Sequence, residues 1–273
     1  MEEVRNKFQV SGLKLHVKNR QLNRHSFPLF RLRRREDRVR GRGGKMDSLI
    51  LDHVPFQIDL EQLSKSMRVK EGSWQVEKLK RLADAAQAVA KPKALYKVAF
   101  IDSKGEDRVI VNGIALTSRV LRVNLEKAHR IFPFVATCGE ELEKWSRPID
   151  DLLEKYWADV IKEMALRAAV KNLSEHLAER YQPGKMSRMN PGSLPDWPLE
   201  EQRPLFFLLE NGPASIGVKL TDSFLMLPIK SVSGIWFPTE ESFESCRLCA
   251  REKCPGRRAP YDQGLFDRKY RKA

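Results

Sequence analysis

Residues 219–237, KLTDSFLMLPIKSVSGIWF, are the stretch of sequence that best defines the fold. Two of its segments, 223–228 and 230–237, carry alternating or continuous apolar residues, a pattern typical of β-strands. A third strand is predicted just before them, at 215–221. Successive short strands of this kind indicate a sheet whose neighbouring strands are mostly antiparallel.

The middle of the chain predicts further strands. Residues 94–101 (ALYKVAFI) and 107–114 (DRVIVNGI) are apolar segments on either side of the turn-rich residues 102–106, so they predict a β-hairpin. Residues 131–137 (IFPFVAT) predict another strand, which ends at Cys138.

Four segments place apolar residues at helical spacing. The longest is 148–179, where Pro148 fits the first turn of a helix. The other predicted helices are 73–90, 117–129 and 198–210. Hairpins and segregated helices together predict an α+β fold with a central, twisted, mostly antiparallel sheet flanked by helices.

The segments between these elements are predicted to be irregular. Residues 46–60 read as an extended segment, because Pro55 disfavours a helix interior there. Residues 181–198 are rich in Pro, Gly, Ser and Asn and predict a loop. Together with the elements above, this gives one main domain over residues 46–240.

The composition indicates a protein with a substantial core. The chain has 273 residues, of which 41% are hydrophobic. No apolar run approaches the roughly 18–20 residues that span a bilayer, and no secretory signal is evident. We therefore expect a cytoplasmic protein without a membrane partner.

Basic residues are concentrated at the N-terminus. Residues 1–45 hold 14 of the 50 Lys and Arg residues but only 4 of the 36 Asp and Glu residues, so most of the net charge of +14 belongs to this segment. We expect it to be a disordered tail, with Met46 as an alternative start. An RNA-binding function would depend on this tail alone, so nucleic acid is a disfavoured partner.

The cysteines point to a second kind of chemistry. Three of the four, Cys246, Cys249 and Cys254, lie within nine residues of the C-terminal segment 241–273. Without a secretory signal, such clustering favours metal or redox chemistry over disulfides. Thiolates at this spacing suit an iron–sulfur cluster or zinc, with Cys138 as the remaining cysteine for a fourth ligand. The alternative is three free thiols in an irregular tail.

Three segments of the chain resemble the activation domain of cobalamin (vitamin B12)-dependent methionine synthase. Residues 219–237 resemble its Lys-Leu-Thr-Glu-Ser-Phe block, residues 188–192 (RMNPG) its Arg-x-x-Pro-Gly loop, and Asp52, Pro55 and Phe56 its Asp-x-x-Pro-Phe start. The three occur in the family's order and span residues 50 to 240.

The resemblance is closer to stand-alone relatives of this domain. Those relatives carry Asn-Pro-Gly-Ser, then Asp-Trp-Pro-Leu-Glu-Glu-Gln, then a late cysteine cluster followed by Pro-Gly-Arg-Arg. Here these motifs are residues 190–193, 196–202 and 246–258. The chain lacks the Asp-x-His-x-x-Gly loop of a cobalamin-carrying module, so any cobalamin is expected on a partner protein.

The resemblance implies a site for S-adenosylmethionine. Arg188 is the candidate for the ligand carboxylate, because a planar guanidinium can bind both oxygens. Arg180 begins a second Arg-x-x-Pro-Gly sequence and is the alternative. The remaining implied contacts are Asp52, for the ammonium group or the adenosine hydroxyls, the loop residues Pro191 and Gly192, and the strand-end pair Trp236 and Phe237.

The family's activity implies a methyltransferase-type enzyme that reactivates a corrinoid cofactor. S-adenosylmethionine would provide the methyl group, a corrinoid protein would be the partner, and a flavodoxin-like or other reductant would provide the electron. The alternative is a non-catalytic module that senses S-adenosylmethionine or holds a metal while it binds a corrinoid protein.

Overall fold

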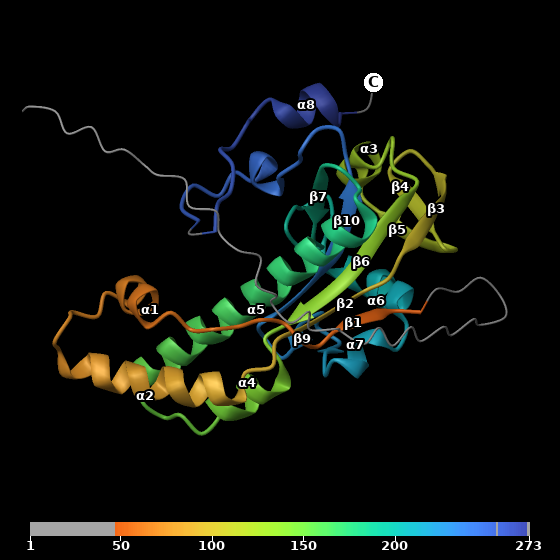
Figure 1. Cartoon of the computed structure of the whole chain (residues 1–273). Helices are drawn as coiled ribbons and strands as arrows, with labels where there is room; N and C mark the ends of the chain where they lie inside the picture. Colours follow the sequence, from red (N-terminus) through yellow and green to blue (C-terminus); the bar gives the residue numbers. More distant parts are fainter. Residues whose placement is uncertain (1–46, 255, 272–273) are drawn as a thin grey trace, which may run out of the picture. The chain divides into compact units, whose positions relative to one another are not determined.

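The computed structural model describes residues 47–254 and 256–271. Their centre is an eight-stranded sheet in which every pairing is antiparallel (Figure 1). The longest central strand, β6 (Arg130–Thr137), pairs on one side with β2 (Lys93–Tyr96) and β3 (Ala99–Lys104), and on the other with β10 (Ser231–Pro238). The outer strands are β1 (Leu49–Leu51) on β2, β7 (Met186–Met189) on β10, and β4 (Arg108–Val111) with β5 (Ile114–Thr117) continuing from β3.

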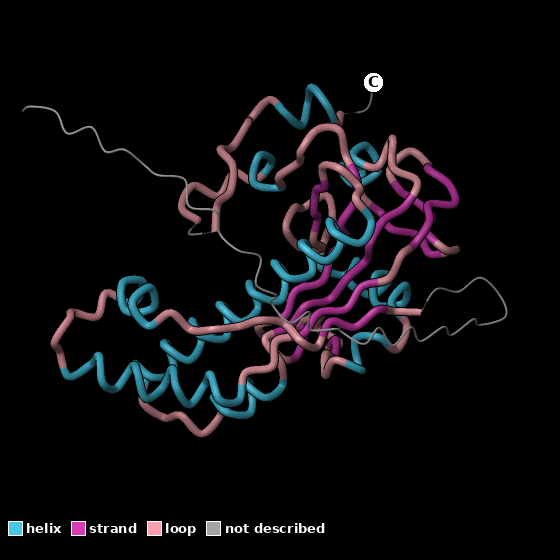
Figure 2. The backbone as a smooth tube through the Cα atoms, in the orientation of Figure 1, coloured by secondary structure: helices cyan, strands magenta, loops and turns pink. Residues whose placement is uncertain are grey.

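One long helix covers one face of this sheet. Helix α5 (Leu152–Tyr181) runs along β2 and β6 (Figure 2). Asp151 begins the helix, since its carboxylate accepts the backbone N–H groups of Leu153 and Glu154. Three further helices pack on the first half of α5, and they are α1 (Leu60–Met67), α2 (Trp74–Val89) and α4 (Glu140–Ser146).

Shorter elements complete the fold. The opposite face of the sheet carries α3 (Arg119–Asn124) and α6 (Gln202–Leu209), which is preceded by a 3-10 turn (Leu199–Glu201). A small hairpin joins β8 (Lys219–Leu220) to β9 (Met226–Leu227). The remaining short helices are α7 (Gly212–Ser215), a 3-10 turn at Ser245–Leu248 and α8 (Leu265–Lys269).

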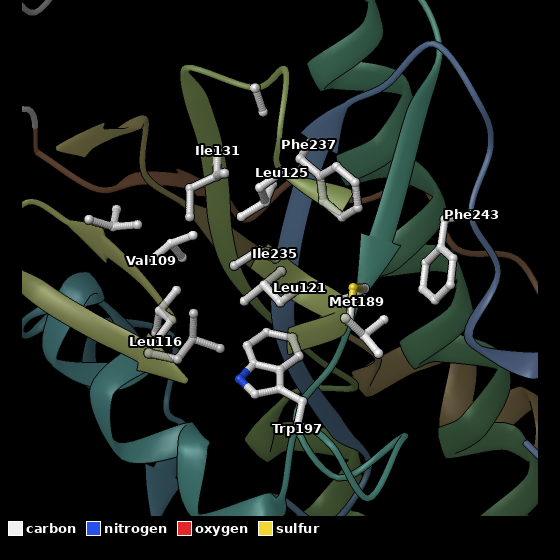
Figure 3. Close-up of a cluster of buried hydrophobic side chains, with 14 of the residues drawn as sticks. Val109, Leu116, Leu121, Leu125, Ile131, Met189, Trp197, Ile235, Phe237 and Phe243 are labelled. Atoms are coloured by element: carbon white, nitrogen blue, oxygen red, sulfur yellow. The ribbon is translucent and has the colours of Figure 1, made fainter. Parts of the chain in front are cut away.

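Strand alternation divides the core into two sides. On β6, Phe132 and Phe134 face α5, whereas Ile131 faces the other side. That other side is the larger cluster, in which Trp197, Ile235 and Phe237 pack together (Figure 3). Side chains alternate in the same way on β10, and this alternation determines which of the candidate site residues face α5.

The predicted α+β fold is confirmed. The strands predicted at 131–137 and 230–237 lie within one residue of β6 and β10. Other predictions differ from the structure. The hairpin predicted from 94–101 and 107–114 consists of the four strands β2 to β5, and the strand predicted at 223–228 is regular only at β9. The strand predicted at 215–221 is a helical turn followed by the two residues of β8, and the loop predicted at 181–198 contains β7, which is held by its pairing with β10.

The predicted boundary at residue 240 does not separate two bodies. Phe243, Leu265 and Tyr270 are buried in the larger core cluster, so the C-terminal segment belongs to the same compact unit. The predicted disordered tail, 1–45, and the alternative start at Met46 lie outside the described residues. No described helix has the length and apolar character needed to cross a membrane.

Candidate functional site

Arg188 and Trp236 lie directly opposite each other on β7 and β10. Both side chains face the α5 side of the sheet, and the guanidinium carbon lies 5.3 Å from the centroid of the indole ring. This is a cation–π contact, in which the ring face partly compensates the charge of the arginine. The pair brings together two of the residues that the family resemblance implies for the site.

The polar atoms of this pair are only partly satisfied. Nε of Arg188 and Nε1 of Trp236 are buried and have no hydrogen-bond partner within the described part of the chain. A buried donor without an acceptor is costly, so the pair is well suited to bind an oxygen atom of a ligand. The donor set therefore fits a carboxylate.

Nearby charges add to this character. Burial, and to a smaller extent the charge of Arg258, lower the pKa of Arg188 to about 10, while the charge of Glu244 opposes the shift. The guanidinium remains charged at neutral pH, but it is poorly solvated. Glu244 forms an ion pair with Arg258 at 2.9 Å, so it is shared between the two arginines. An anionic ligand would relieve the unfavourable burial of Arg188.

A row of stacked aromatic and arginine side chains, in which Phe132 is fully buried, continues from this pair along the sheet. Trp236 is opposite Phe132 on β6, and the Phe132 ring lies 5.0 Å from that of Tyr181, the last residue of α5. Arg130 lies on the same face of β6 and stacks on both rings at 5.6 Å. We call Arg188, Trp236, Phe132, Tyr181 and Arg130 the aromatic–arginine strip.

Arg180, the alternative ligand residue, also borders the strip. Its guanidinium carbon lies 5.8 Å from the centroid of the Tyr181 ring. The two Arg-x-x-Pro-Gly sequences, beginning at Arg180 and Arg188, therefore flank the same surface. Arg188 is the one in contact with Trp236.

The loop after β7 is tightly built. Gly192 has a positive φ of 79°, donates its backbone N–H to the carbonyl of Trp197 at 2.8 Å, and leaves no room for a Cβ beside Leu199. Asn190 donates to the carbonyl of Ser233 at 2.6 Å and Pro191 is buried. These contacts fix the loop that contains Pro191 and Gly192 against β10.

The Asp-Trp-Pro motif that follows the loop has a structural role. Asp196 accepts hydrogen bonds from the backbone N–H groups of Arg119 and Val120 and from the hydroxyl of Ser118, and thus caps α3. Trp197 is fully buried in the larger core cluster (Figure 3). The motif connects the loop to the core and supplies no exposed ligand group.

The block at 219–228 is also largely structural. Its residues form the β8–β9 hairpin, in which the hydroxyl of Thr221 accepts the backbone N–H of Leu225 at 3.0 Å. Gln202, a buried residue of α6, donates to the carbonyl of Phe224 at 3.0 Å and accepts from Ser233 of β10. The hairpin is thereby tied to the strand that carries Trp236.

Asp52 is separated from Trp236 by strands β2 and β6, and no contact among the described residues joins the two side chains. It follows β1, where Leu51 is level with Ala94, which is in turn level with Ala136 and Val232. Three strand spacings of about 4.8 Å and five steps of about 3.3 Å then place its Cα roughly 20 Å from that of Trp236. Its side chain is largely exposed and lies 3.6 Å from His53.

Phe237 requires a correction for the same geometric reason. Neighbouring residues of a strand point to opposite faces, so Phe237 points away from Trp236 and is fully buried in the larger cluster (Figure 3). Its side chain is a core residue, and only its backbone lies near the strip.

The cysteines do not converge as predicted. Cys138 is buried in the cluster between α2, α4 and α5, where burial raises its pKa to about 12. It follows the end of β6 that pairs with the start of β10, whereas the other three cysteines follow the end of β10. Among the described residues, no three His, Cys, Asp or Glu side chains are grouped to hold a metal.

The loop around Cys246 is nevertheless ordered by arginines. The guanidinium of Arg257 donates to the carbonyls of Cys246 and Cys249 at 3.1 and 3.2 Å. The backbone N–H of Arg258 lies 3.5 Å from Sγ of Cys246, and this contact is the main cause of the lowered pKa of that thiol. Since Arg258 also pairs with Glu244 beside Arg188, the cysteine loop borders the strip.

The sequence interpretation missed Arg130, Phe132 and Tyr181. Phe132 lies in the strand predicted at 131–137 and Arg130 directly precedes that strand, so a strand one residue longer would place both side chains on one face. The contact with Tyr181 joins segments about fifty residues apart and could not be predicted from spacing.

Two cavities lie elsewhere. One of about 480 Å³ is walled by Val120, Leu194, Leu248, Tyr261 and Phe266, and another of about 600 Å³ lies between α6 and β8. Neither is lined by Arg188 or Trp236. We place the candidate site at the strip because of its unpaired donors and charges, which cavity size does not report.

The fold is that of a known class of domain. A solved structure described as the MetH reactivation domain bound to AdoHcy superimposes with a TM-score of 0.51 and 17% sequence identity, covering 74% of this chain and 81% of that chain. Residues 171–250 match the family model "Vitamin B12 dependent methionine synthase, activation domain". The predicted resemblance is therefore confirmed. No curated protein matches the chain.

Proposed function

We propose that this protein restores an inactive corrinoid cofactor by reductive methylation, with S-adenosylmethionine bound at the aromatic–arginine strip. The observation that carries the proposal is the Arg188–Trp236 pair, which offers two buried, unpaired donors next to a stacking surface. The family match over residues 171–250 supports it, because that segment contains both partners of the pair.

Different residues of the strip would contact different parts of the ligand. Arg188 would hold the ligand carboxylate, and the partly exposed side chain of Trp236 would hold a planar ring by stacking. When bound, S-adenosylmethionine would supply a methyl group to a corrinoid carried by a partner protein and reduced by a flavodoxin-like or other donor. The chain's own part is to position the ligand and exclude water, so it needs no general base.

The activity is tested with cob(II)alamin, S-adenosylmethionine and a chemical reductant, by following methylcobalamin formation with and without the protein. We expect stimulation by the wild type and loss with Arg188→Ala. A matched control is Arg167→Ala, since Arg167 is an exposed arginine of α5 paired only with Glu163. Equal stimulation by both variants would exclude Arg188 as the ligand residue.

A second candidate is a non-catalytic module that senses S-adenosylmethionine while it binds a corrinoid protein. The observation that favours it is the position of Glu244 and Arg258, which place the C-terminal segment beside Arg188. A ligand bound at the strip would change the electrostatic interaction between Arg188 and the C-terminal segment. Tight nucleoside binding without methylcobalamin formation would support this function.

The cysteine loop carries a separate proposal, an iron–sulfur cluster or zinc on Cys246, Cys249 and Cys254. Arg257 already holds two of these residues on one turn, but the three thiols are not grouped, so metal entry requires the loop to rearrange. Iron and zinc analysis of anaerobically purified protein tests the proposal. Cys138→Ser should retain all metal, whereas Cys249→Ser should lose it; absence of metal from the wild type would exclude the site.

A further inference from the structure

Buried polar atoms without a hydrogen-bond partner are concentrated at the candidate site. In the part of the chain that the structure describes, four buried side-chain nitrogen or oxygen atoms have no such partner. Two of them are Nε of Arg188 and Nε1 of Trp236, and a third is Oε2 of Glu244. The fourth belongs to Glu141 of α4, at the far end of β6. Because buried polar atoms are costly to leave unpaired, three of them in one place indicate a ligand site.

Glu244 is held next to Arg188 by a hydrogen bond of the preceding residues. Phe243 donates its backbone N–H to the hydroxyl of Ser187 at 2.7 Å, and both residues are buried. The residues that follow them in the chain, Glu244 and Arg188, are therefore close together. In agreement with this, the charge of Glu244 opposes the lowering of the pKa of Arg188. The C-terminal segment thus brings a carboxylate to the arginine of β7.

Arg258 contacts the Glu244 carboxylate without satisfying it. Nη2 of Arg258 lies 2.9 Å from Oε2 of Glu244, but the contact lacks the geometry of a hydrogen bond. Although this oxygen is buried, the side chains of Arg258 and Glu244 are 43% and 39% exposed, so a solute can reach them. Arg188 and Trp236 are also partly exposed. The four side chains therefore form a polar site that is open to solvent on one side.

The unpaired atoms match the amino-acid end of a ligand. An α-amino acid carries a carboxylate, which accepts hydrogen bonds, and an ammonium group, which donates them. Arg188 and Trp236 offer two donors, and Glu244 offers an acceptor. Because both ligand groups are bonded to one carbon atom, their protein partners must be neighbours, as Arg188 and Glu244 are. Charge-assisted hydrogen bonds to both ends would satisfy all three buried atoms.

We propose that Glu244 binds the α-ammonium group of S-adenosylmethionine, so that the C-terminal segment completes the amino-acid end of the site. The inference rests on the proposed function and makes Glu244 a specificity-determining residue. The site then selects nucleosides that carry a zwitterionic amino-acid end. Asp52, the other acidic candidate, is separated from Trp236 by β2 and β6.

Calorimetric titration of the full chain with S-adenosylmethionine and with its desamino analogue, which lacks only the α-ammonium group, tests the proposal. We expect the wild type to bind the analogue about tenfold more weakly, because the analogue leaves the buried oxygen of Glu244 unpaired. Glu244→Gln should bind S-adenosylmethionine about tenfold more weakly than the wild type does. Its affinity for the analogue should be unchanged, which also shows that the variant is folded.

Three further variants separate ligand recognition from structure. Glu244→Asp keeps the charge on a shorter side chain and should retain part of the discrimination between the two ligands. Glu240→Gln is the matched control, since Glu240 is an exposed residue of the same segment paired with Lys127, and it should keep the wild-type ratio of affinities. Asp52→Asn should keep that ratio as well.

Two results would overturn the inference about Glu244. One is an unchanged ratio, or an equal loss of both ligands, in Glu244→Gln. The other is loss of the discrimination in Asp52→Asn but not in Glu244→Gln, which would assign the ammonium group to Asp52. Failure of the wild type to bind either ligand would instead overturn the proposed function.

Discussion

The carboxylate of Asp196 accepts the backbone N–H of Val120 at 3.0 Å, so the loop that follows β7 caps helix α3. This hydrogen bond links the site loop to the opposite side of the core. It explains why an Asp-Trp-Pro sequence follows the loop: Asp196 satisfies the helix terminus, and Trp197 fills the cluster beneath it.

We expect Asp196→Ala to lower the free energy of unfolding by about 1–3 kcal/mol, because it removes a helix cap and leaves partly buried N–H groups without acceptors. Urea denaturation measures the effect. Asp150→Ala is the control, since that side chain is almost fully exposed and its loss should change stability by less than about 0.5 kcal/mol. Equal stability of the two variants would contradict the capping role.

Trp236 and Phe237 should respond to substitution in opposite ways. Phe237→Ala empties a fully buried position and should cost about 3–5 kcal/mol of stability. Trp236→Ala should cost less stability but weaken nucleoside binding, since an aromatic contact of this kind contributes about 0.5–1.5 kcal/mol. Thermal unfolding and ligand titration of both variants check this. Unchanged ligand affinity in the Trp236 variant would show that Trp236 does not contact the ligand.

Gly234 allows β7 and its loop to approach β10. A Cβ at this position would lie 2.4 Å from Nδ2 of Asn190 and 2.5 Å from the carbonyl oxygen of Met189. We expect Gly234→Ala to lower stability by roughly 2–3 kcal/mol and to weaken ligand binding, because the strands must separate. Gly256→Ala, where a Cβ meets nothing within 4 Å, is the matched control in denaturation experiments.

His176 should make the protein less stable as the pH falls. Burial, and then the charge of Arg180, lower its pKa below the usual 6.5. Below pH 6.5 the unfolded chain takes up a proton that the folded chain resists, so stability is present above this pH and is lost as the pH falls through the folded pKa. Unfolding measured between pH 7 and pH 5 should show a shallower loss in His176→Gln. An identical pH dependence in both proteins would contradict this.

Long, periodic elements could be predicted from the sequence because their stability is encoded locally. Helix α5 and strands β6 and β10 follow from apolar spacing alone. Strand β7 could not be predicted, because its four residues, MSRM, have no strand pattern and are held by the register with β10. The same register places Arg188 opposite Trp236, so the motifs indicated the residues of the site while tertiary pairing determined their contact.

The errors in the candidate site have a common physical origin. Phe237 was expected beside Trp236 because the family resemblance implies ligand contacts at both positions, although strand alternation turns the two side chains to opposite faces. Cys138 was grouped with the late cysteines by residue type, although β6 and β10 place them at different ends of the sheet. Arg130 was overlooked because a single arginine at a strand end has no motif, and only its stacking on Phe132 and Tyr181 gives it significance.

The burial of Phe243, Leu265 and Tyr270 in the main core affects how fragments of this protein should be prepared. A recombinant fragment that ends at residue 240 would lose these three buried side chains and expose the faces of α3 and β7 that they cover. It would also remove Glu244 and Arg258 from the vicinity of Arg188. Such a truncation would report the affinity of a damaged surface. Expression designs should therefore retain residues 241–273 and place purification tags at the N-terminus.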